Sequence, residues 1–500
     1  MFSKKYIGIF LIVYTLLRVF SYFFSPETPL HAANPVNTVV SGIMLLVIGY
    51  WLLARNPLGW YAIALEIILG GAGGYLAAGP LSLRTCLLLI SILIYFGQKL
   101  RDHKLKELFQ QNKTVVYLFS ALFLAVGISA IHGFLAGHNK NFIFPDTIPY
   151  LFLLYYFPLK ELITAKSSNL QIFKSSLLAA ILGNFLLIIF TFIGYSSELF
   201  VLQDSYYHWY RDVAIGKITE LPFHFYRLVI NEHLLLVPII LWLLSCVIAR
   251  RSEERTTTSQ SPSSTKKPWD YYVAPLLVMT LLIILSINLT RIYMLALAFG
   301  YLFLFSKQHW KRWFVYGVVS CLLFVVSFTS IHLVASRGQS LGWELFGLRL
   351  QSIVQPSIEE SAFSRKLLLP KIVDKIKQQP ILGTGLGDTV TVYSPVFKKE
   401  VTTPHFDWGY LEILAEMGIF GLLAWLFLIT SILSRLRINK PPSPAEAPYG
   451  WAKAGLAALL VINLTSPALF HVLGIIWLTY LLASLSQSSQ NLSESVSQSV

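Results

Sequence analysis

Four ionisable side chains stand where polar segments of the sequence meet apolar ones: Arg291, Arg365, His405 and Asp407. An arginine beside an apolar run either binds an anion or extends its charge toward water. A carboxylate or an imidazole can take a proton from a reacting group. Together these residue types suit proton abstraction near an anionic leaving group.

Each of the four also has an ordinary structural use. Arg291, in NLTRIYMLAL, can snorkel to the membrane surface. Arg365 can be a solvated charge, although a cation near a helix start opposes the helix dipole. Asp407 can be the N-cap of the helix that follows, and His405 an ordinary interfacial residue. The residues alone leave both interpretations open.

A glycine-rich turn, ILGTGLGD, precedes the last two of these residues and contains Gly383, Gly385 and Gly387. Such a turn can present backbone N–H groups to a phosphate, or it can simply reverse the chain. Because it follows a predicted helix and not a strand, it is neither a dinucleotide-binding fingerprint nor a P-loop. We therefore expect either a phosphate contact or a turn that returns the chain to the bilayer.

The elements that must position these residues are membrane-spanning helices. Hydrophobic residues make up 55% of the 500 residues and charged residues only 13%, whereas soluble domains carry about 25% charged residues. Too little polar surface remains to cover a soluble helical protein. The net charge of +14 lies in short loops, which argues against a nucleic-acid partner. We predict an all-α polytopic membrane protein whose partner is the lipid bilayer.

The apolar runs predict about fourteen transmembrane helices. The first run follows Lys4 and Lys5 without a small-residue cleavage site, so we expect a retained span and not a signal peptide. Cys86, Cys246 and Cys321 lie inside apolar runs and are predicted to be packing residues. The predicted spans are 6–24, 36–54, 58–78, 81–98, 115–136, 147–163, 173–195, 226–248, 270–288, 290–306, 313–334, 408–433, 450–466 and 469–485.

Basic residues gather in alternate loops, which places those loops and both termini in the cytoplasm. The predicted parts are an N-terminal transmembrane bundle at 1–334, a large external loop at 335–407 and C-terminal transmembrane helices at 408–485. A flexible cytoplasmic linker is predicted near 250–268. A disordered tail is predicted at 486–500.

The external loop is predicted to contain short helices. One is amphipathic over SAFSRKLLLPKIVDKIKQQP, with Pro370 in or near its first turn and Pro380 at its end. A second external segment, 195–225, is predicted as a short interfacial helix. Glu412 and Glu416, one turn apart, are costly in lipid, so we expect them to face the protein interior or the interface.

Around these residues the sequence resembles the O-antigen ligase and O-antigen polymerase superfamily, multispan membrane enzymes that act on undecaprenyl-diphosphate-linked glycans. In that family an arginine precedes a P-hydrophobic-L-G-x-G-x-G turn, and a Tyr-Leu-x-x-Leu-x-Glu-x-Gly-x-x-Gly helix start follows. Here Arg365 precedes PILGTGLG, and YLEILAEMGIFG begins at Tyr410. LTRIYMLAL resembles the earlier Ser-Arg motif of the family and places Arg291.

One part of the pattern departs from the family. The family's His position falls on Asp407 and its Asn position on Trp408, while His405 lies two residues earlier. Either His405 takes the same role after a small shift, or Asp407 replaces the histidine. The change weakens assignment to the ligase branch, where histidine is usual.

The resemblance implies a metal-independent, inverting glycosyl transfer without a cofactor, on the outer face of the bacterial cytoplasmic (inner) membrane. The donor would be a polyprenyl-diphosphate-linked oligosaccharide, and the acceptor a glycan, a lipid A core or a protein. Arg291 and Arg365 would bind the diphosphate, and Asp407 or His405 would deprotonate or orient the acceptor hydroxyl. Further substrate contacts are expected from Gly383, Gly385, Gly387 and Tyr410.

The main alternative from another class is a transporter or flippase of lipid-linked saccharides. Such a protein would carry charges near the midplane of several helices, whereas here polarity gathers at the predicted outer mouth, which favours an enzyme. Among enzymes, a ligase, a repeat-unit polymerase and an O-linked protein oligosaccharyltransferase differ in their acceptor. The residues do not reveal which acceptor is used.

Overall fold

The structure, a computed structural model, describes residues 4–25, 34–69, 71–164, 169–250, 269–355, 360–394, 398–438 and 448–497. Helices dominate these residues, and their strands form three two-stranded antiparallel hairpins. The predicted fold class, an all-α polytopic membrane protein, is confirmed. The linker predicted near 250–268 lies outside the described residues except for Arg250, the last residue of a helix.

Nine helical segments in the described part of the chain are long and apolar enough to cross a membrane. Five shorter apolar helices occupy the places of the remaining predicted spans. The nine long segments are Lys5–Phe23, Pro35–Leu53, Leu83–Arg101, Lys113–Leu135, Lys140–Ile163, Ser175–Ser196, Asn231–Ile248, Lys307–Ala335 and Gly409–Arg437. The shorter helices are Leu58–Ile68, Val273–Asn288, Arg291–Leu302, Gly450–Ile462 and Val472–Ser486.

The chain divides into two compact units, each built from separate stretches of sequence. The first unit comprises Met1–Gly97, Glu161–Leu345 and Pro441–Gly455. The second comprises Gln98–Lys160, Phe346–Lys440 and Leu456–Val500. Among the described residues, four helices have residues in both units: α4 (Leu83–Arg101), α8 (Tyr156–Thr164), α16 (Trp343–Val354) and α19 (Pro448–Ile462).

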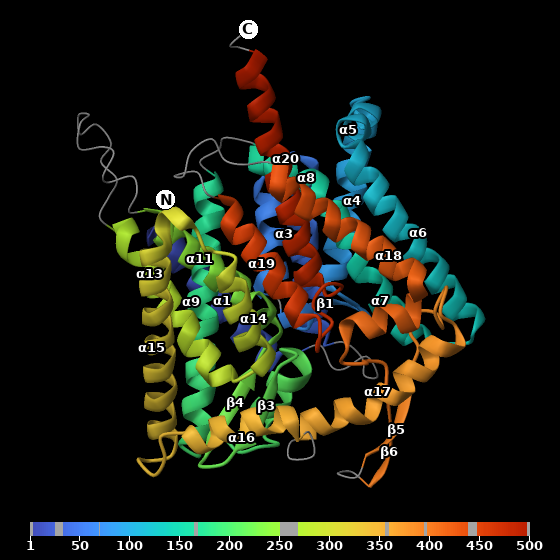
Figure 1. The fold of residues 1–500 in the computed structure, drawn as a ribbon. Coiled ribbons are helices and arrows are strands. Elements are labelled where there is room, and N and C mark those ends of the chain that lie inside the picture. Colours follow the sequence, from blue (N-terminus) through green and yellow to red (C-terminus); the bar gives the residue numbers. More distant parts are fainter. Residues whose placement is uncertain are drawn as a thin grey trace, which may run out of the picture. The chain divides into compact units, whose positions relative to one another are not determined.

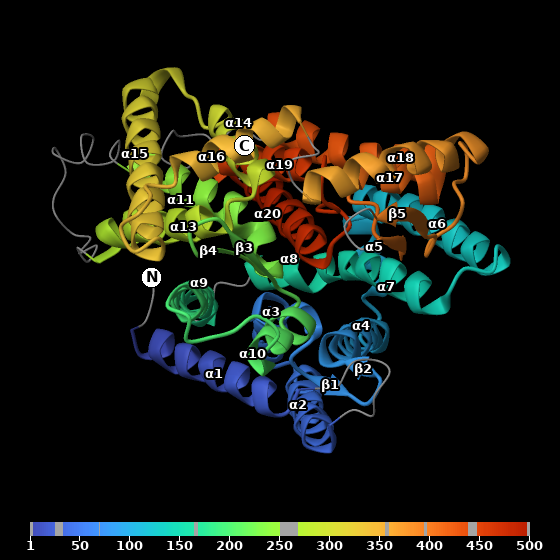
Figure 2. The same ribbon diagram turned by 90° about the horizontal axis from the view of Figure 1, so that it is seen from below.

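In the first unit, helices α1 and α9 lie side by side (Figures 1 and 2). Tyr14 of α1 and Ala180 of α9 are buried against each other, with Leu65 and Ile68 packed around them. The helices of this unit are α1 (Lys4–Phe23), α2 (Pro35–Leu53), α3 (Leu58–Leu69), α9 (Asn169–Ser196), α10 (Ser205–His208), α11 (Leu236–Arg250), α13 (Trp269–Asn288), α14 (Arg291–Leu302) and α15 (Trp310–Ala335). Its hairpins are β1 (Ala77–Ala78) with β2 (Leu81–Ser82), and β3 (Lys217–Leu221) with β4 (Phe225–Val229).

In the second unit, α18 packs against α6 and against α17. The amphipathic helix α17 buries Leu368 and Ile372 in a small core with Val390, Phe406 and Ala415. The helices of this unit are α5 (Leu105–Gln111), α6 (Lys113–Leu135), α7 (Lys140–Leu151), α17 (Glu360–Gln378), α18 (Gly409–Ile438) and α20 (Val472–Ser497). In the hairpin of this unit, β5 (Val390–Ser394) pairs with β6 (Lys399–Thr403).

Several boundaries differ from those predicted. The span predicted at 226–248 begins as strand β4 and becomes an α-helix at Leu236. In the segment 195–225, the short helix α10 continues into a π-helical turn, Trp209–Val213, before β3. Pro370 lies well inside α17, which begins at Glu360. The exposed position of Lys366 explains this tolerance, because water can reach the turn whose hydrogen bond proline removes. Helix α20 continues to Ser497, past the predicted start of the tail.

Candidate active site

Arg365 and Asp407 are brought together in the second unit. Arg365 lies in the first turns of α17, and Asp407 lies two residues before α18 begins at Gly409. The Arg365 Nε and the Asp407 Oδ2 are 3.8 Å apart, and the two side chains are 26% and 43% exposed. An ion pair this exposed contributes at most about 1 kcal/mol to stability. The pair is therefore not needed to hold the fold. Both side chains are partly exposed, although the Arg365 Nε itself is buried.

The backbone around Asp407 fixes this geometry. Asp407 has a φ of +58°, a left-handed conformation that aspartate tolerates better than most residues. The next residue, Trp408, donates its indole Nε1–H to the backbone carbonyl of Arg365 at 3.3 Å. Within the described residues, no backbone N–H of α18 donates to the Asp407 carboxylate. The carboxylate thus faces Arg365 and does not serve as a helix cap.

His405 is placed differently. Its side chain is exposed, and its backbone forms a local turn in which its N–H donates to Thr403 Oγ1 at 3.1 Å. Thr403 Oγ1 also donates to the His405 carbonyl at 3.2 Å. The structure therefore pairs Asp407, and not His405, with Arg365.

Tyr410 and Gly409 attach the start of α18 to α19. Tyr410 donates its hydroxyl to the Leu460 carbonyl at 2.8 Å. A Cβ at Gly409 would lie 2.5 Å from Asn463 Oδ1, so only glycine allows this approach. The Tyr410 hydroxyl, predicted as a substrate contact, is engaged with the protein backbone.

The glycine-rich turn docks onto a break in α18. Gly418 has φ +62° and ψ −165°, a conformation open essentially to glycine alone, and it interrupts the helix. The carbonyls of Ala415 and Glu416 accept hydrogen bonds from Thr384 N (2.7 Å) and Gly385 N (3.0 Å). Beyond the break, Ile419 N and Phe420 N donate to the carbonyls of Pro380 and Ile381 at 2.9 and 3.2 Å.

The turn therefore supplies the partners that the broken helix loses. Unpaired backbone groups are costly at membrane depth, so a broken span needs such a partner. Close approach requires that Cβ atoms be absent: a Cβ at Gly383 would lie 2.3 Å from the Glu416 carbonyl carbon. The N–H groups of Gly383 and Gly385 donate to Gln379 O and Glu416 O. Since these donors are occupied, the structure gives Gly383 and Gly385 a packing role, and their predicted substrate contact stays a prediction.

The same turn also contacts α6 and α7. Leu386 N donates to the Ser129 carbonyl at 3.0 Å, and a Cβ at Gly385 would lie 2.4 Å from Gly133 N. A Cβ at Gly387 would lie 2.7 Å from Ile143 N of α7. All three glycines thus pack against helices of the second unit.

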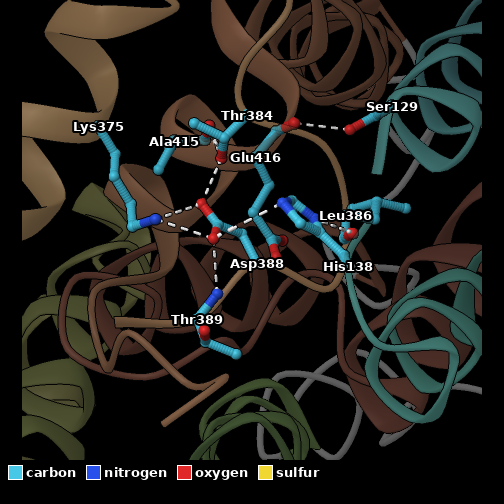
Figure 3. Close-up of polar contacts among 9 residues, drawn as sticks. All are labelled: Ser129, His138, Lys375, Thr384, Leu386, Asp388, Thr389, Ala415 and Glu416. Carbon is cyan, nitrogen blue, oxygen red and sulfur yellow. Dashed lines mark hydrogen bonds and ion pairs between the residues drawn. The ribbon is translucent and has the colours of Figure 1, made fainter. Parts of the chain in front are cut away.

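Asp388, directly after the turn, is the centre of a polar cluster that the sequence analysis did not single out (Figure 3). Its carboxylate is buried and accepts from Lys375 Nζ at 2.8 and 2.7 Å, one distance to each oxygen. Thr384 Oγ1 (2.6 Å) and Thr389 N (2.7 Å) also donate to it. His138 Nε2 lies 3.8 Å away. The sequence signal was the acid that closes ILGTGLGD, but its partners come from distant segments.

Glu416 of α18 lies beside this cluster (Figure 3), and Glu412 lies one turn before it on the same helix. Glu412 and Glu416 are each only 4% exposed. This confirms the prediction that they face the protein interior or the interface, and of these two alternatives it is the interior. Ser129 Oγ donates to the Glu416 backbone carbonyl at 2.6 Å, which ties this turn of α18 to α6.

Arg291 lies in the first unit. It is the first residue of α14, directly after Thr290, and is partly buried. Arg227 of β4 holds the preceding loop, because its Nε donates to Asn288 O and its Nη2 to Thr290 Oγ1, both at 2.9 Å. The helix N-terminus and the arginine both favour an anion at this position. Arg227 was missed from sequence, where it stands in an unremarkable aromatic segment.

These observations describe a multispan helical membrane protein with a partly exposed arginine–carboxylate pair at the start of a span. Residues 276–426 match the family described as O-antigen ligase, a region that includes Arg291, Arg365 and Asp407. The predicted resemblance to the O-antigen ligase and polymerase superfamily is thereby confirmed. The match supports an O-antigen-ligase-like glycan transfer in a membrane. No curated protein matches the chain.

Proposed function

We propose that this protein is a glycosyltransferase that takes glycan from a polyprenyl-diphosphate-linked donor on the outer face of the cytoplasmic membrane. The observation that carries the proposal is the pairing of Arg365 with Asp407, within the region matched by the O-antigen ligase family. A cation that meets a diphosphate and a carboxylate that meets a hydroxyl are the two groups that glycosyl transfer needs.

In the proposed reaction, Asp407 accepts the proton of the acceptor hydroxyl. The acceptor oxygen then bonds to the anomeric carbon of the donor sugar with inversion, as the bond to the diphosphate oxygen breaks. Negative charge develops on the departing diphosphate, and Arg365 stabilises it. A diphosphate contact by Arg291 stays a prediction that rests on the family resemblance. A guanidinium carries five N–H donors in a planar fork, which suits the oxygens of a diphosphate. In this proposal the transfer is metal-independent.

His405 is the alternative base. Its exposure and its local turn with Thr403 give it no described contact with Arg365 or Asp407, which supports Asp407. The proposal leaves the acceptor class to experiment, because an oligosaccharide, a lipid A core and a protein all offer hydroxyl groups.

The test compares Arg365→Ala with Lys366→Ala, an exposed neighbour on the same helix. Purified variants are given lipid-linked donor and acceptor, and release of polyprenyl diphosphate is measured. We expect Arg365→Ala to lose about 10²-fold or more in rate, and Lys366→Ala to keep its rate. Normal release by Arg365→Ala at normal protein levels would overturn the proposed site.

A deletion strain complemented with each variant identifies the acceptor. Single-repeat glycans indicate a polymerase, accumulated lipid-linked polymer a ligase, and unglycosylated proteins a protein glycosyltransferase. Donor retained on the cytoplasmic face would indicate a transporter instead. Unchanged glycans in the deletion strain would contradict all of these activities.

A further inference from the structure

The ion pair between Lys375 and Asp388, here called the Lys375–Asp388 clamp, joins α17 to the end of the glycine-rich turn. Lys375 is 23% exposed and Asp388 8% exposed at the side chain, and both carboxylate oxygens lie within 2.8 Å of the lysine Nζ. Charge-assisted bonds of this length are stronger than neutral ones. The clamp is thus a firm contact, unlike the exposed pair of Arg365 and Asp407.

The acid of the clamp is attached to the transmembrane helices. The residue two before it, Leu386, donates its N–H to Ser129 O of α6 and accepts, at its carbonyl, from His138 Nδ1 at 3.0 Å. Gly385 N donates to Glu416 O of α18. Asp388 is therefore held in place relative to α6 and α18, and the clamp holds α17 in place relative to the same two helices.

Helix α17 connects the clamp to the candidate active site. Arg365 precedes Lys375 by ten positions on one helix, a distance of about 15 Å at 1.5 Å per residue. Between them, Leu368 and Ile372 form a core with Phe406. A tilt of a few degrees at the clamp would displace the Arg365 end by about 1 Å, and such a displacement in an active site can cost 10²-fold in rate.

We propose that Lys375 and Asp388 are positioning residues that hold Arg365 in the place where it meets Asp407 and the diphosphate. This inference rests on the proposed function and deepens it by naming the residues on which the arginine's placement depends. Lys375 and Asp388 contact each other and not the reacting atoms, so they act through α17.

The experiment compares three substitutions on α17, measured as kcat and KM for lipid-linked donor per folded molecule. Lys375→Met removes the cation and should lower kcat by about ten- to one-hundred-fold. Lys375→Arg keeps the charge and should restore most of the rate. Lys377→Met, an exposed lysine of the same turn, is the matched control and should keep the wild-type rate.

A double-mutant cycle separates positioning from general stability. If Lys375 acts through Arg365, adding Lys375→Met to Arg365→Lys should lower the rate far less than it does in the wild-type protein. An equal fold-loss in both backgrounds, or a loss that disappears once the amount of folded protein is matched, would overturn the positioning role.

The two proposals fail in different ways. Full activity of Arg365→Ala would remove the proposed function and the clamp's role with it. Loss of activity in Arg365→Ala together with a wild-type rate in Lys375→Met would overturn the clamp alone.

Discussion

The short segment from Thr403 to Trp408 gives its two ionisable side chains opposite surroundings. Asp407 adopts a left-handed backbone and lies 3.8 Å from Arg365, whereas His405 points to the surface beside a threonine turn. Trp408, which stands where the resembled family has asparagine, donates to the backbone of Arg365. The two residues that depart from the family pattern therefore contact the same arginine: the acid lies beside its side chain, and the indole donates to its backbone carbonyl.

This arrangement predicts which residue acts as the base. Asp407→Asn keeps the shape but cannot accept a proton, so polyprenyl diphosphate release should fall by about 10²–10⁴-fold. His405→Ala should retain most of the rate, because the histidine is exposed and has no described contact with Arg365 or Asp407. Initial rates of purified variants at matched protein amounts check both. The reverse result, an active Asp407→Asn and an inactive His405→Ala, would assign the base to His405.

At the level of residues, sequence reasoning found Arg365 and Asp407 but not the contacts that fix them. Apolar-to-polar boundaries and motif spacing point to single side chains. Asp388 was overlooked because its partners, Lys375 and His138, are recognisable only after the turn has docked onto α6. Arg227 was overlooked because its carbonyl partner, Asn288 at the end of α13, has no signature in sequence.

Among the elements, the glycine-rich turn and the broken helix α18 form one unit of structure. Sequence predicted a turn and a span, and it treated the glycines as a possible phosphate cradle. It could not predict that the two segments exchange backbone hydrogen bonds across Gly418, because that pairing depends on the three-dimensional approach of distant chain segments. Gly383 of PILGTGLG and Gly418 of EMGIFG serve the same contact from its two sides, because a Cβ at Gly383 would lie 2.3 Å from the Glu416 carbonyl carbon and one at Gly418 would lie 2.2 Å from the Ile381 carbonyl oxygen.

A matched pair of substitutions in α6 tests this docking. A Cβ at Gly133 would lie 2.3 Å from Leu386 O, whereas a Cβ at Gly127 on the same helix meets nothing within 4 Å. Gly133→Ala should lower the free energy of unfolding by about 1–3 kcal/mol or more through overpacking. Gly127→Ala should leave it unchanged or raise it slightly, since alanine favours a helix. Thermal unfolding in detergent, followed with transfer activity, measures both.

Equal melting temperatures for Gly133→Ala and Gly127→Ala would contradict the docking of the turn onto α6. Loss of stability in Gly133→Ala with normal activity in the remaining folded protein would leave the docking intact and separate it from catalysis.

On the scale of the whole molecule, the spans were the most predictable feature. Uninterrupted apolar runs need no tertiary information, so the class of fold follows from composition and length. Boundaries were less predictable, because the start of the span at 226–248 is a strand paired with β3, and that pairing partner is not visible in the run itself. The division of the chain into predicted parts at 334, 407 and 485 stays a prediction.

One helix of the second unit leads to a prediction of how these spans are oriented. From Lys113 to Gly133, α6 covers about 30 Å at 1.5 Å per residue, close to the thickness of a hydrocarbon core. Its first end follows the basic segment around Lys106, and its other end meets, at Leu386, the loop that is predicted to be external. That loop also carries lysines, but it exceeds the roughly 60 residues over which loop charge sets topology. We therefore expect Lys106 in the cytoplasm and Lys399 of the loop outside.

Single cysteines at these two exposed lysines test the orientation directly. In a version with Cys86, Cys246 and Cys321 replaced, Lys399→Cys should react with a membrane-impermeant maleimide in intact spheroplasts. Lys106→Cys should react only after the membrane is permeabilised, because the bilayer shields the cytoplasmic end of α6. Labelling of both in denatured protein controls for reactivity, and transfer activity confirms that the replaced cysteines are dispensable. Labelling of Lys106→Cys alone in intact spheroplasts would invert the topology and place the Arg365–Asp407 pair on the cytoplasmic side, away from an outer-face donor.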